Sequence, residues 1–364
     1  MVTPGLLKSI YIHVPFCKSK CSYCNFISFA GKENLVEKYF KALEQEITCN
    51  LSGLKTKFST LYIGGGTPSI IDSAYYEKLL SLINMRNDAE ITIEVNPGTV
   101  DGEYLKKLKE IGFNRLSIGV QCLDNSILKT LNRLHTVENT INTVKAAKES
   151  GFNNINIDLI YGLPGQTLSG WQKMLCQAIE LDVQHISAYG LKIEEGTKFY
   201  RNPPQNLPDE DEVVQMYLKT IEILEQNDFK HYEISNFSKP GYESRHNLTY
   251  WNNEEYFGFG LSAHGYVDGV RYSNNQNLEK YIINPLKKES EKLLSEAERN
   301  EEAIFLGLRL RKGIDISESF YKRFGYIIEK YSSLGLMSME NNVLTLTPEG
   351  ILLSNNILAE FIEE

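Results

Sequence analysis

The sequence predicts an α/β fold built on a parallel sheet with helical crossovers. Between residues 10 and 190, six strand-like segments alternate with helical segments, which is the pattern of repeated βαβ units. Glycine and polar residues stand at the carboxyl ends of these strands, the edge at which such sheets bind ligands. An open doubly wound sheet and a partial barrel both fit this alternation. The first crossover lacks the Gly-x-Gly-x-x-Gly fingerprint, which speaks against a dinucleotide-binding sheet.

Each element follows from its apolar periodicity. Short runs with strand character predict strands at 10–12, 59–64, 91–95, 115–120, 154–160 and 185–189. Apolar residues at three-and-four spacing predict the intervening helices at 32–51, 75–84, 103–111, 136–150 and 170–181. Gly112 and Gly151 follow two of these helices, as expected of glycine at a helix C-terminus.

A less regular region follows the sixth strand. Residues 201–210 are rich in proline and acidic residues and predict a boundary loop, followed by a helix at 211–226. Residues 231–235 predict a short strand. Residues 256–266 are rich in glycine and aromatic residues, and they fit either a segment that closes over the ligand edge or plain core. We assign residues 1–293 to one domain, whose part from about 205 to 293 is a C-terminal extension.

The pattern changes again near residue 294. Helices are predicted at 296–310, 316–324, 326–334 and 349–361. Strands at 336–339 and 343–347 flank Glu340-Asn341-Asn342, which is a hairpin signal. Helices followed by a hairpin predict a small winged-helix-like α+β domain over 294–364. This segment is not notably basic, so we expect it to pack against the first domain and not to bind DNA.

Composition narrows the class of protein. The chain has 364 residues, 42% hydrophobic content and a formal net charge of −9. It has no long basic run, so nucleic acid is not an expected partner. No apolar stretch is long enough to span a bilayer, and no signal-peptide pattern precedes the first strand. Six cysteines are too sparse for a disulfide scaffold, so we expect a soluble, cytoplasmic protein.

Three of the cysteines lie close together after the first strand. Cys17, Cys21 and Cys24 follow Pro15, which ends the strand, so they occupy the loop at its carboxyl end. Thiolates are the ligands of iron–sulfur clusters, and a closed structural site uses four of them. Three cysteines on a four-iron cluster would leave one iron open. The alternatives are a zinc site, with His13 as a possible fourth ligand, or three unrelated thiols.

The cysteine spacing resembles a known family. Cys-x-x-x-Cys-x-x-Cys, with Tyr23 before the last cysteine, is similar to the signature of the radical S-adenosylmethionine (SAM) enzymes. The resemblance implies a [4Fe–4S] cluster held by three cysteines, with SAM bound to the fourth iron. It also implies a partial (β/α)6 barrel of the TIM type, which favours the partial barrel over the open doubly wound sheet. Gly64-Gly65-Gly66-Thr67-Pro68 resembles the glycine-rich element that receives the amino group of SAM.

The resemblance also implies the SAM contacts. They are Tyr11, Tyr23, Gly65, Gly66, Thr67, Glu94, Gln121, Arg133 and Asp158. The chemistry is suitable, since carboxylates and an amide suit the ribose hydroxyls and positive charges of SAM. A guanidinium likewise suits its carboxylate. Taken singly, each residue fits a structural ion pair or a solvated loop equally well.

Longer phrases narrow the subfamily. The chain resembles the oxygen-independent coproporphyrinogen III oxidase and its relatives at residues 11–17, 64–69, 93–97, 116–121 and 156–165. Two features depart from the oxidase. Phe26 stands where the oxidase has another cysteine, and only ten residues precede Tyr11. Both point to the sister group, the HemW heme chaperones, which keep the radical SAM core and hand heme to client proteins.

A further phrase agrees with the chaperone group. Residues 245–251 contain His246, Asn247, Tyr250 and Trp251 in the order His-Asn-x-x-Tyr-Trp, which resembles the heme-binding element of that group. An imidazole can ligate iron, and the aromatic rings offer flat apolar surface to a porphyrin. The alternative is that His246 forms hydrogen bonds within a loop while the aromatic residues fill core.

The sequence therefore predicts a heme chaperone that binds a [4Fe–4S] cluster, SAM and heme. The alternative is an enzyme that decarboxylates coproporphyrinogen III to protoporphyrinogen IX. The expected partners are heme, heme-accepting client proteins and an electron donor such as a flavodoxin or a ferredoxin. Whether SAM is turned over stays open at this point.

Overall fold

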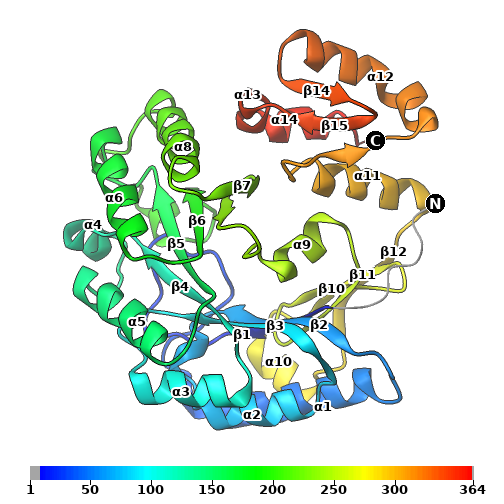
Figure 1. Ribbon diagram of the computed structural model, residues 1–364. Coiled ribbons are helices and arrows are strands. Elements are labelled where there is room, and N and C mark those ends of the chain that lie inside the picture. The colour runs from blue at the N-terminus through cyan, green and yellow to red at the C-terminus, as the bar shows by residue number, and fades with distance from the viewer. Residues whose placement is uncertain (1–8, 363–364) are drawn as a thin grey trace.

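A computed structural model describes residues 9–362 of the chain (Figure 1). Its centre is a run of six parallel strands in sequence order, joined by helices. The strands are β1 (Ser9–Val14), β2 (Phe58–Gly65), β3 (Met85–Val95), β4 (Arg115–Gln121), β5 (Ile155–Tyr161) and β6 (His185–Gly190). The predicted α/β fold with six strand–helix units is confirmed.

The crossover helices cover the outer face of the curved sheet (Figure 1). They are α1 (Val36–Leu51), α2 (Ser73–Ser81), α3 (Gly102–Ile111), α4 (Asn125–Thr130), α5 (Val137–Glu149) and α6 (Leu168–Glu180). Two 3-10 turns, η1 (Glu33–Leu35) and η2 (Pro68–Ile70), precede α1 and α2. The apolar faces of these helices and the alternate residues of the strands form one continuous hydrophobic core, so the ligand edge of the sheet stands on a rigid base.

The extension lengthens the sheet at both edges. Its elements are α7 (Lys198–Arg201), α8 (Glu210–Glu225), β7 (Lys230–Glu233), β8 (Asn236–Ser238), α9 (Arg245–Trp251), β9 (Tyr256–Phe259), β10 (His264–Val267), β11 (Val270–Asn274), α10 (Leu278–Ile283) and β12 (Lys288–Leu293). Strand β8 pairs antiparallel with β6, whereas β9 pairs parallel with β1. Over residues 9–362 the sheet has twelve strands and stays open, with β12 and β7 at its edges.

The glycine-rich segment 256–266 belongs to this extended sheet. Phe257 and Phe259 of β9 are buried and stack on each other, with ring centroids 5.2 Å apart. Glycine is required at Gly258, because a Cβ atom there would lie 1.8 Å from the carbonyl oxygen of His264 on β10. The segment is therefore core, and of the two alternatives left open by its sequence, closure over the ligand edge is wrong.

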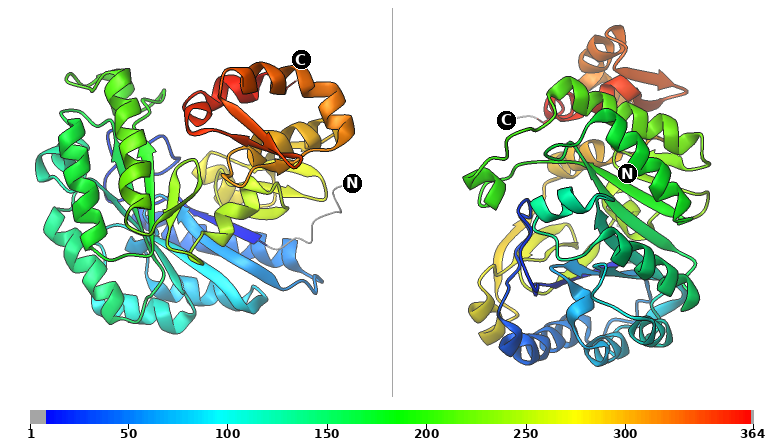
Figure 2. Two further views of the ribbon diagram at one scale, coloured as in Figure 1. Left: turned by 45° about the horizontal axis from the view of Figure 1, so that its top comes forward. Right: turned by 90° about the vertical axis from the view of Figure 1, so that its left-hand side faces the viewer.

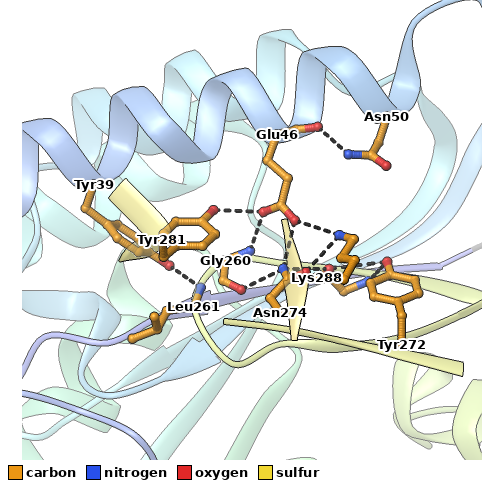
Figure 3. A network of polar contacts seen from close by, with 10 residues as sticks. Tyr39, Glu46, Asn50, Gly260, Leu261, Tyr272, Asn274, Tyr281 and Lys288 are labelled. Atoms are coloured by element: carbon orange, nitrogen blue, oxygen red, sulfur yellow. Dashed lines mark hydrogen bonds and ion pairs between the residues drawn. The ribbon is translucent and has the colours of Figure 1, made fainter. Parts of the chain in front are cut away.

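A buried carboxylate attaches the extension to α1 (Figure 3). The Glu46 side chain is fully buried, and its oxygens accept hydrogen bonds from Gly260 N, Tyr281 Oη and Asn274 Nδ2 at 2.7–2.8 Å. Lys288 Nζ of β12 also lies 3.1 Å from Glu46 Oε1. One side chain of an outer helix thus holds a loop, a helix and two strands of the extension.

The C-terminal part is a small α+β unit with its own core. It contains α11 (Glu296–Gly307), β13 (Ile314–Asp315), α12 (Glu318–Ser333), β14 (Met337–Glu340), β15 (Val343–Leu346), α13 (Pro348–Leu352) and α14 (Ser354–Ala359). Its three strands form an antiparallel sheet in the order β13-β15-β14. Tyr217 of α8 joins this second core, so the unit packs on the longest helix of the extension. Figure 2 shows it apart from the crossover helices α1–α5.

Two predicted helix boundaries in this unit are wrong. The helices expected at 316–324 and 326–334 are one helix, α12, because the burial of Phe324, Ile327 and Ile328 outweighs the cost of about 1 kcal/mol for glycine at 325. The helix expected at 349–361 breaks at Leu353 into α13 and α14. Among residues 9–362, no helix is both long and apolar enough to cross a bilayer.

Candidate functional site

A cavity of about 360 Å³ lies at the carboxyl ends of the six parallel strands. It is lined by residues in or just after the carboxyl-terminal halves of β1 to β6, so the strand-end clustering expected from the sequence is present. The lining includes the three cysteines and all but one of the residues predicted to contact SAM: Cys17, Cys21, Cys24, Tyr23, Gly65, Gly66, Thr67, Glu94, Gln121, Arg133 and Asp158. The remaining residue is Tyr11, which lies beneath the cavity with its ring stacked on that of Tyr62.

The cysteine loop, residues 17–28, is closed at its base and attached at its middle. Cys17 N donates to Phe29 O at 3.0 Å, and Phe29 N donates to Pro15 O at 2.8 Å. Within the loop, Ser22 N donates to Leu131 O, and Ser22 O accepts from Phe199 N of α7. Three backbone hydrogen bonds from the loop, to Phe29, Leu131 and Phe199, and a fourth that closes its base therefore hold the thiols at the cavity before any ligand binds.

The donor set suits a cluster better than a single metal ion. All six cysteines are free thiols. Within residues 9–362, no three His, Cys, Asp or Glu side chains converge on a point where one ion would sit. A zinc site needs four such donors about 2.0–2.3 Å from one ion, whereas a cluster spreads its thiolates over several irons. Three thiols along one cavity wall therefore fit an iron–sulfur cluster.

His13 does not supply a fourth ligand in this structure. Its Nε2 donates to Ile27 O at 2.8 Å, and its Nδ1 lies 3.0 Å from the Tyr11 hydroxyl. Burial lowers the pKa of His13 to about 4, so the ring is neutral at physiological pH. With both nitrogens engaged, His13 supports the floor of the site, and the zinc alternative loses its fourth donor.

The glycine-rich turn must be glycine for steric reasons. Gly65 has φ of +113°, and a Cβ atom there would lie 2.5 Å from His13 Cε1. A Cβ atom at Gly66 would lie 2.7 Å from Phe16 O. Without side chains, Gly66 N donates to Val14 O and Thr67 N donates to Phe16 O, both at 2.8 Å. The glycines therefore let the end of β2 lie directly against the start of the cysteine loop.

Two carboxyl groups face the cavity, one from β3 and one from β5, the strands on either side of β4. Glu94 accepts hydrogen bonds from Tyr62 Oη at 3.0 Å and from Gly65 N at 3.1 Å. Burial, and then the charge of Asp158, raise the pKa of Glu94 to about 7. Asp158 accepts from Ser117 Oγ and Asn156 Nδ2, and burial raises its pKa as well. Carboxylates oriented in this way are suited to accept hydrogen bonds from hydroxyl or ammonium groups of a ligand.

Gln121 reaches the cavity through an irregularity in the sheet. The pairing of β4 with β5 shifts register between Ile118 and Gln121, and Gln121 has a positive φ of 66°. Gly119 leaves space for this arrangement, because a Cβ atom there would lie 2.9 Å from Gln121 Nε2. A strand bulge of this kind redirects a side chain, here into the cavity.

Asn96 is a cavity residue to which the sequence analysis assigned no role. It follows Glu94 and Val95 at the end of β3 and lies between two predicted SAM residues. Its Nδ2 donates to Thr67 Oγ1 at 3.0 Å, and its Oδ1 accepts from Arg133 Nη2 at 2.7 Å. The sequence signals were its position at a strand end and its place within residues 93–97, which resemble the family, whereas its partners come from distant segments.

The segment predicted to bind heme forms helix α9, which packs on β2. His246 is 1% exposed, with Nδ1 2.9 Å from Thr60 Oγ1 and Nε2 2.7 Å from Tyr250 Oη. Its ring stacks on Tyr62, which lines the cavity on its other side, with centroids 5.2 Å apart. Burial lowers the pKa of His246 to about 3. The imidazole is therefore neutral and has both nitrogens engaged in this arrangement.

The other end of α9 faces the C-terminal unit (Figure 1). The guanidinium of Arg309, which follows α11, lies over the ring of Trp251 at 5.4 Å and over that of Phe305 at 4.7 Å. Within the described part of the chain, Trp251 Nε1 and Arg309 Nε are buried and have no hydrogen-bond partner. Asn247 is half-buried, and its backbone N–H is capped by Ser244 Oγ. The seam between α9 and α11 thus contains polar groups that could receive a ligand.

Comparison with known proteins agrees with this architecture. The sequence model of the radical SAM superfamily matches residues 11–176, and that of the HemN C-terminal domain matches residues 294–353. Among solved structures, coproporphyrinogen III oxidase (HemN) from Escherichia coli superposes with a TM-score of 0.86. It is 24% identical in sequence, and the match covers 99% of this chain and 91% of that chain. At this identity the likeness shows a common fold.

Full-length relatives show the family. Heme chaperone HemW from Lactococcus lactis subsp. lactis is 37% identical over 370 residues, which is 97% of this chain and 97% of the relative. Heme chaperone HemW from Bacillus subtilis is 36% identical over 380 residues, covering 98% of this chain and all of the relative. The resemblance drawn from the cysteine spacing and the longer phrases is confirmed. The chain belongs to the HemW family of radical SAM proteins.

Proposed function

We propose that this protein is a heme chaperone that binds a [4Fe–4S] cluster, SAM and heme, and delivers heme to client proteins. The observation that carries the proposal is the full-length similarity to proteins named heme chaperone HemW. The cavity supports it independently, because three free thiols line it together with carboxyl, amide and guanidinium side chains.

The three cysteines of the loop are the proposed cluster ligands. A cluster held by three thiolates keeps one iron open to an exchangeable ligand, which is the chemistry it would supply here. Burial raises the pKa of the Cys24 thiol to about 11, so ligation must supply the free energy that removes this proton.

SAM is proposed to lie beside the cysteine loop, within the 360 Å³ cavity. Glu94, Gln121 and Asp158 face that space with oxygen and amide groups suited to hydroxyl and ammonium groups. The bare backbone of Gly65 and Gly66 permits the close approach of a ligand. Tyr11 acts from below, by holding His13 and Tyr62 in place.

Heme is proposed to bind at helix α9, at the residues His246, Asn247, Tyr250 and Trp251. Ligation of iron by His246 requires its Nε2 to leave the Tyr250 hydroxyl, so the proposal includes a change of side-chain conformation within α9. The unpartnered Trp251 Nε1 and Arg309 Nε support a ligand at the seam, since a guanidinium there is suited to a heme propionate.

The test of the function uses one anaerobically reconstituted sample for two measurements. Heme is titrated into the protein and followed by its Soret absorbance, and coproporphyrinogen III is supplied to the same sample with SAM and a reductant. We expect saturable heme binding and unchanged coproporphyrinogen III. Formation of protoporphyrinogen IX at a rate matching the oxidase would replace the chaperone proposal with the enzyme.

His246→Ala tests the place of heme on the chain. We expect at least tenfold weaker heme binding with unchanged iron content, because the substitution removes the proposed iron ligand and leaves the cysteine loop intact. His264→Ala is the matched control, since His264 is an exposed histidine on β10. Equal heme affinity of the two variants would remove α9 from the heme site.

The remaining proposals concern partners and location. An electron donor such as a flavodoxin or a ferredoxin would reduce the cluster. The half-exposed Cys21 and Cys24 would hold the cluster near the surface, within reach of such a donor. A cytoplasmic location is consistent with six free thiols, because thiols stay reduced in that compartment.

A further inference from the structure

A continuous chain of hydrogen bonds joins two of the three proposed cluster ligands through Asn96. Thr67 Oγ1 lies 3.5 Å from Cys17 Sγ, and Asn96 Nδ2 lies 3.0 Å from the same Thr67 oxygen. On the other side, Arg133 Nη2 lies 2.7 Å from Asn96 Oδ1, and Arg133 Nη1 lies 3.5 Å from Cys21 Sγ. The chain therefore runs from one sulfur to the other through three side chains.

The direction of every hydrogen bond in this chain is determined by chemistry. A guanidinium can only donate, so the amide oxygen of Asn96 must face Arg133. The amide nitrogen then faces Thr67 and donates to its hydroxyl oxygen. The hydroxyl proton of Thr67 is left to point at another acceptor, and Cys17 Sγ is the acceptor within reach. Asn96 thus orients the Thr67 hydroxyl toward Cys17 Sγ and the Arg133 guanidinium toward Cys21 Sγ.

Asn96 is itself held rigidly in this position. Its backbone N donates to Ser69 Oγ at 3.1 Å, and its carbonyl oxygen accepts from Thr99 Oγ1 at 2.6 Å. Arg133 is further held by a hydrogen bond from Nη2 to Gly119 O at 2.5 Å. Both donors to sulfur are consequently fixed before a cluster binds.

We propose that Asn96 is a positioning residue that directs the Thr67 hydroxyl and the Arg133 guanidinium to the cluster thiolates and raises the cluster's reduction potential. The inference rests on the proposed function, because it requires a cluster on the cysteine loop. Hydrogen bonds to ligand sulfurs stabilise the more negatively charged, reduced cluster, and outer partners of this kind tune metal sites. Thr67 and Arg133, expected to contact SAM, therefore also act on the cluster.

Asn96→Asp tests the direction of these hydrogen bonds, because aspartate has nearly the same size and shape as asparagine. A carboxylate can only accept, so it draws the Thr67 hydroxyl proton away from Cys17 while Arg133 keeps its partner. Thr67→Val removes the same proton without adding charge, and Thr67→Ser restores it. Thr99→Val is the control for loss of backbone support alone, because Asn96 keeps its backbone bond to Ser69 and its side-chain bonds to Thr67 and Arg133 in that variant.

The measurement is a redox titration of the reconstituted proteins by electron paramagnetic resonance, with iron and sulfide content determined on the same samples. For Asn96→Asp and Thr67→Val we expect wild-type iron content and an equilibrium constant for one-electron reduction about tenfold smaller, or about 59 mV. Thr67→Ser and Thr99→Val should retain the wild-type potential.

The inference would be overturned if Asn96→Asp and Thr67→Val, at full iron content, had the same reduction potential as Thr99→Val. The proposed function would then still stand. Wild-type protein that takes up no iron would overturn both. If Asn96→Asp does not fold, equal potentials of Thr67→Val and Thr67→Ser would overturn the inference, because Asn96 reaches Cys17 only through the Thr67 hydroxyl.

Discussion

Replacing Glu46 with alanine removes the carboxylate that attaches the sheet extension to helix α1. In the wild-type protein this side chain receives four donors, from Gly260, Asn274, Tyr281 and Lys288 (Figure 3). In the variant, all four donor groups lose this acceptor at a buried site. The Lys288 ammonium keeps one strong partner, Asn274 Oδ1 at 2.8 Å, together with the face of the Tyr272 ring at 4.4 Å.

The expected loss follows from the burial of both partners. The side chains of Glu46 and Lys288 are 0% and 13% exposed, so Glu46→Ala leaves a largely desolvated positive charge without its counter-ion. Breaking a buried ion pair on one side costs about 3–5 kcal/mol. At roughly 2 °C per kcal/mol for a domain of this size, the apparent Tm should fall by about 6–10 °C.

Thermal melts followed by circular dichroism measure this change. Glu37→Ala is the matched control on the same helix, because the Glu37–Lys41 pair is exposed to solvent and should contribute little to stability. The double variant Glu46→Leu/Lys288→Met should regain more than half of the loss, since it leaves no buried charge unpaired. A Tm for Glu46→Ala as close to wild type as that of Glu37→Ala would refute the reasoning.

Three further predictions concern the site and its surroundings. Serine at each of the three loop cysteines should abolish iron uptake, whereas Cys176→Ser, at an exposed position, should not; full iron in any loop variant would contradict the ligand assignment. Burial raises the pKa of Glu233 to about 7. The folded state therefore keeps a proton that the unfolded state releases above its lower pKa. Stability contributed by Glu233 is present below the unfolded pKa and is lost as pH rises toward 7. Relative to Glu233→Gln, wild type should thus lose about 3 kcal/mol between pH 4.5 and 8 in urea titrations, and a constant difference would show that Glu233 does not titrate there. Gly66→Ala places a Cβ atom 2.7 Å from Phe16 O. It should cost about 1–3 kcal/mol and weaken SAM binding measured by calorimetry, while Gly102→Ala, with open space around it, should change neither.

Much of the barrel could be read from the sequence because its signals are local. Each parallel strand is a short apolar run, and each crossover helix repeats its apolar residues at three-and-four spacing. Parallel strands bring their carboxyl ends to one edge, so Glu94, Gln121 and Asp158 could be expected from the sequence to share a cavity.

Boundaries and edges were less predictable because competing energies decide them. Gly325 reads as a break between two helices, yet burial of the residues beyond it keeps α12 continuous. The segment 256–266 shows strand-like and loop-like features together. Its pairing with β1, more than 240 positions earlier in the chain, makes it part of the sheet.

The amino-acid order alone determined the alternation of strands and helices, the cysteine loop and the glycine-rich turn, since each depends on neighbours within a few positions. Tertiary structure alone decided that His246 is enclosed by Thr60, 186 positions away, and that Asn96 bridges Thr67 and Arg133. Hydrogen bonds between distant segments carry no periodic signal in the sequence. They form only when the folded chain brings side chains from distant segments within about 3 Å of one another.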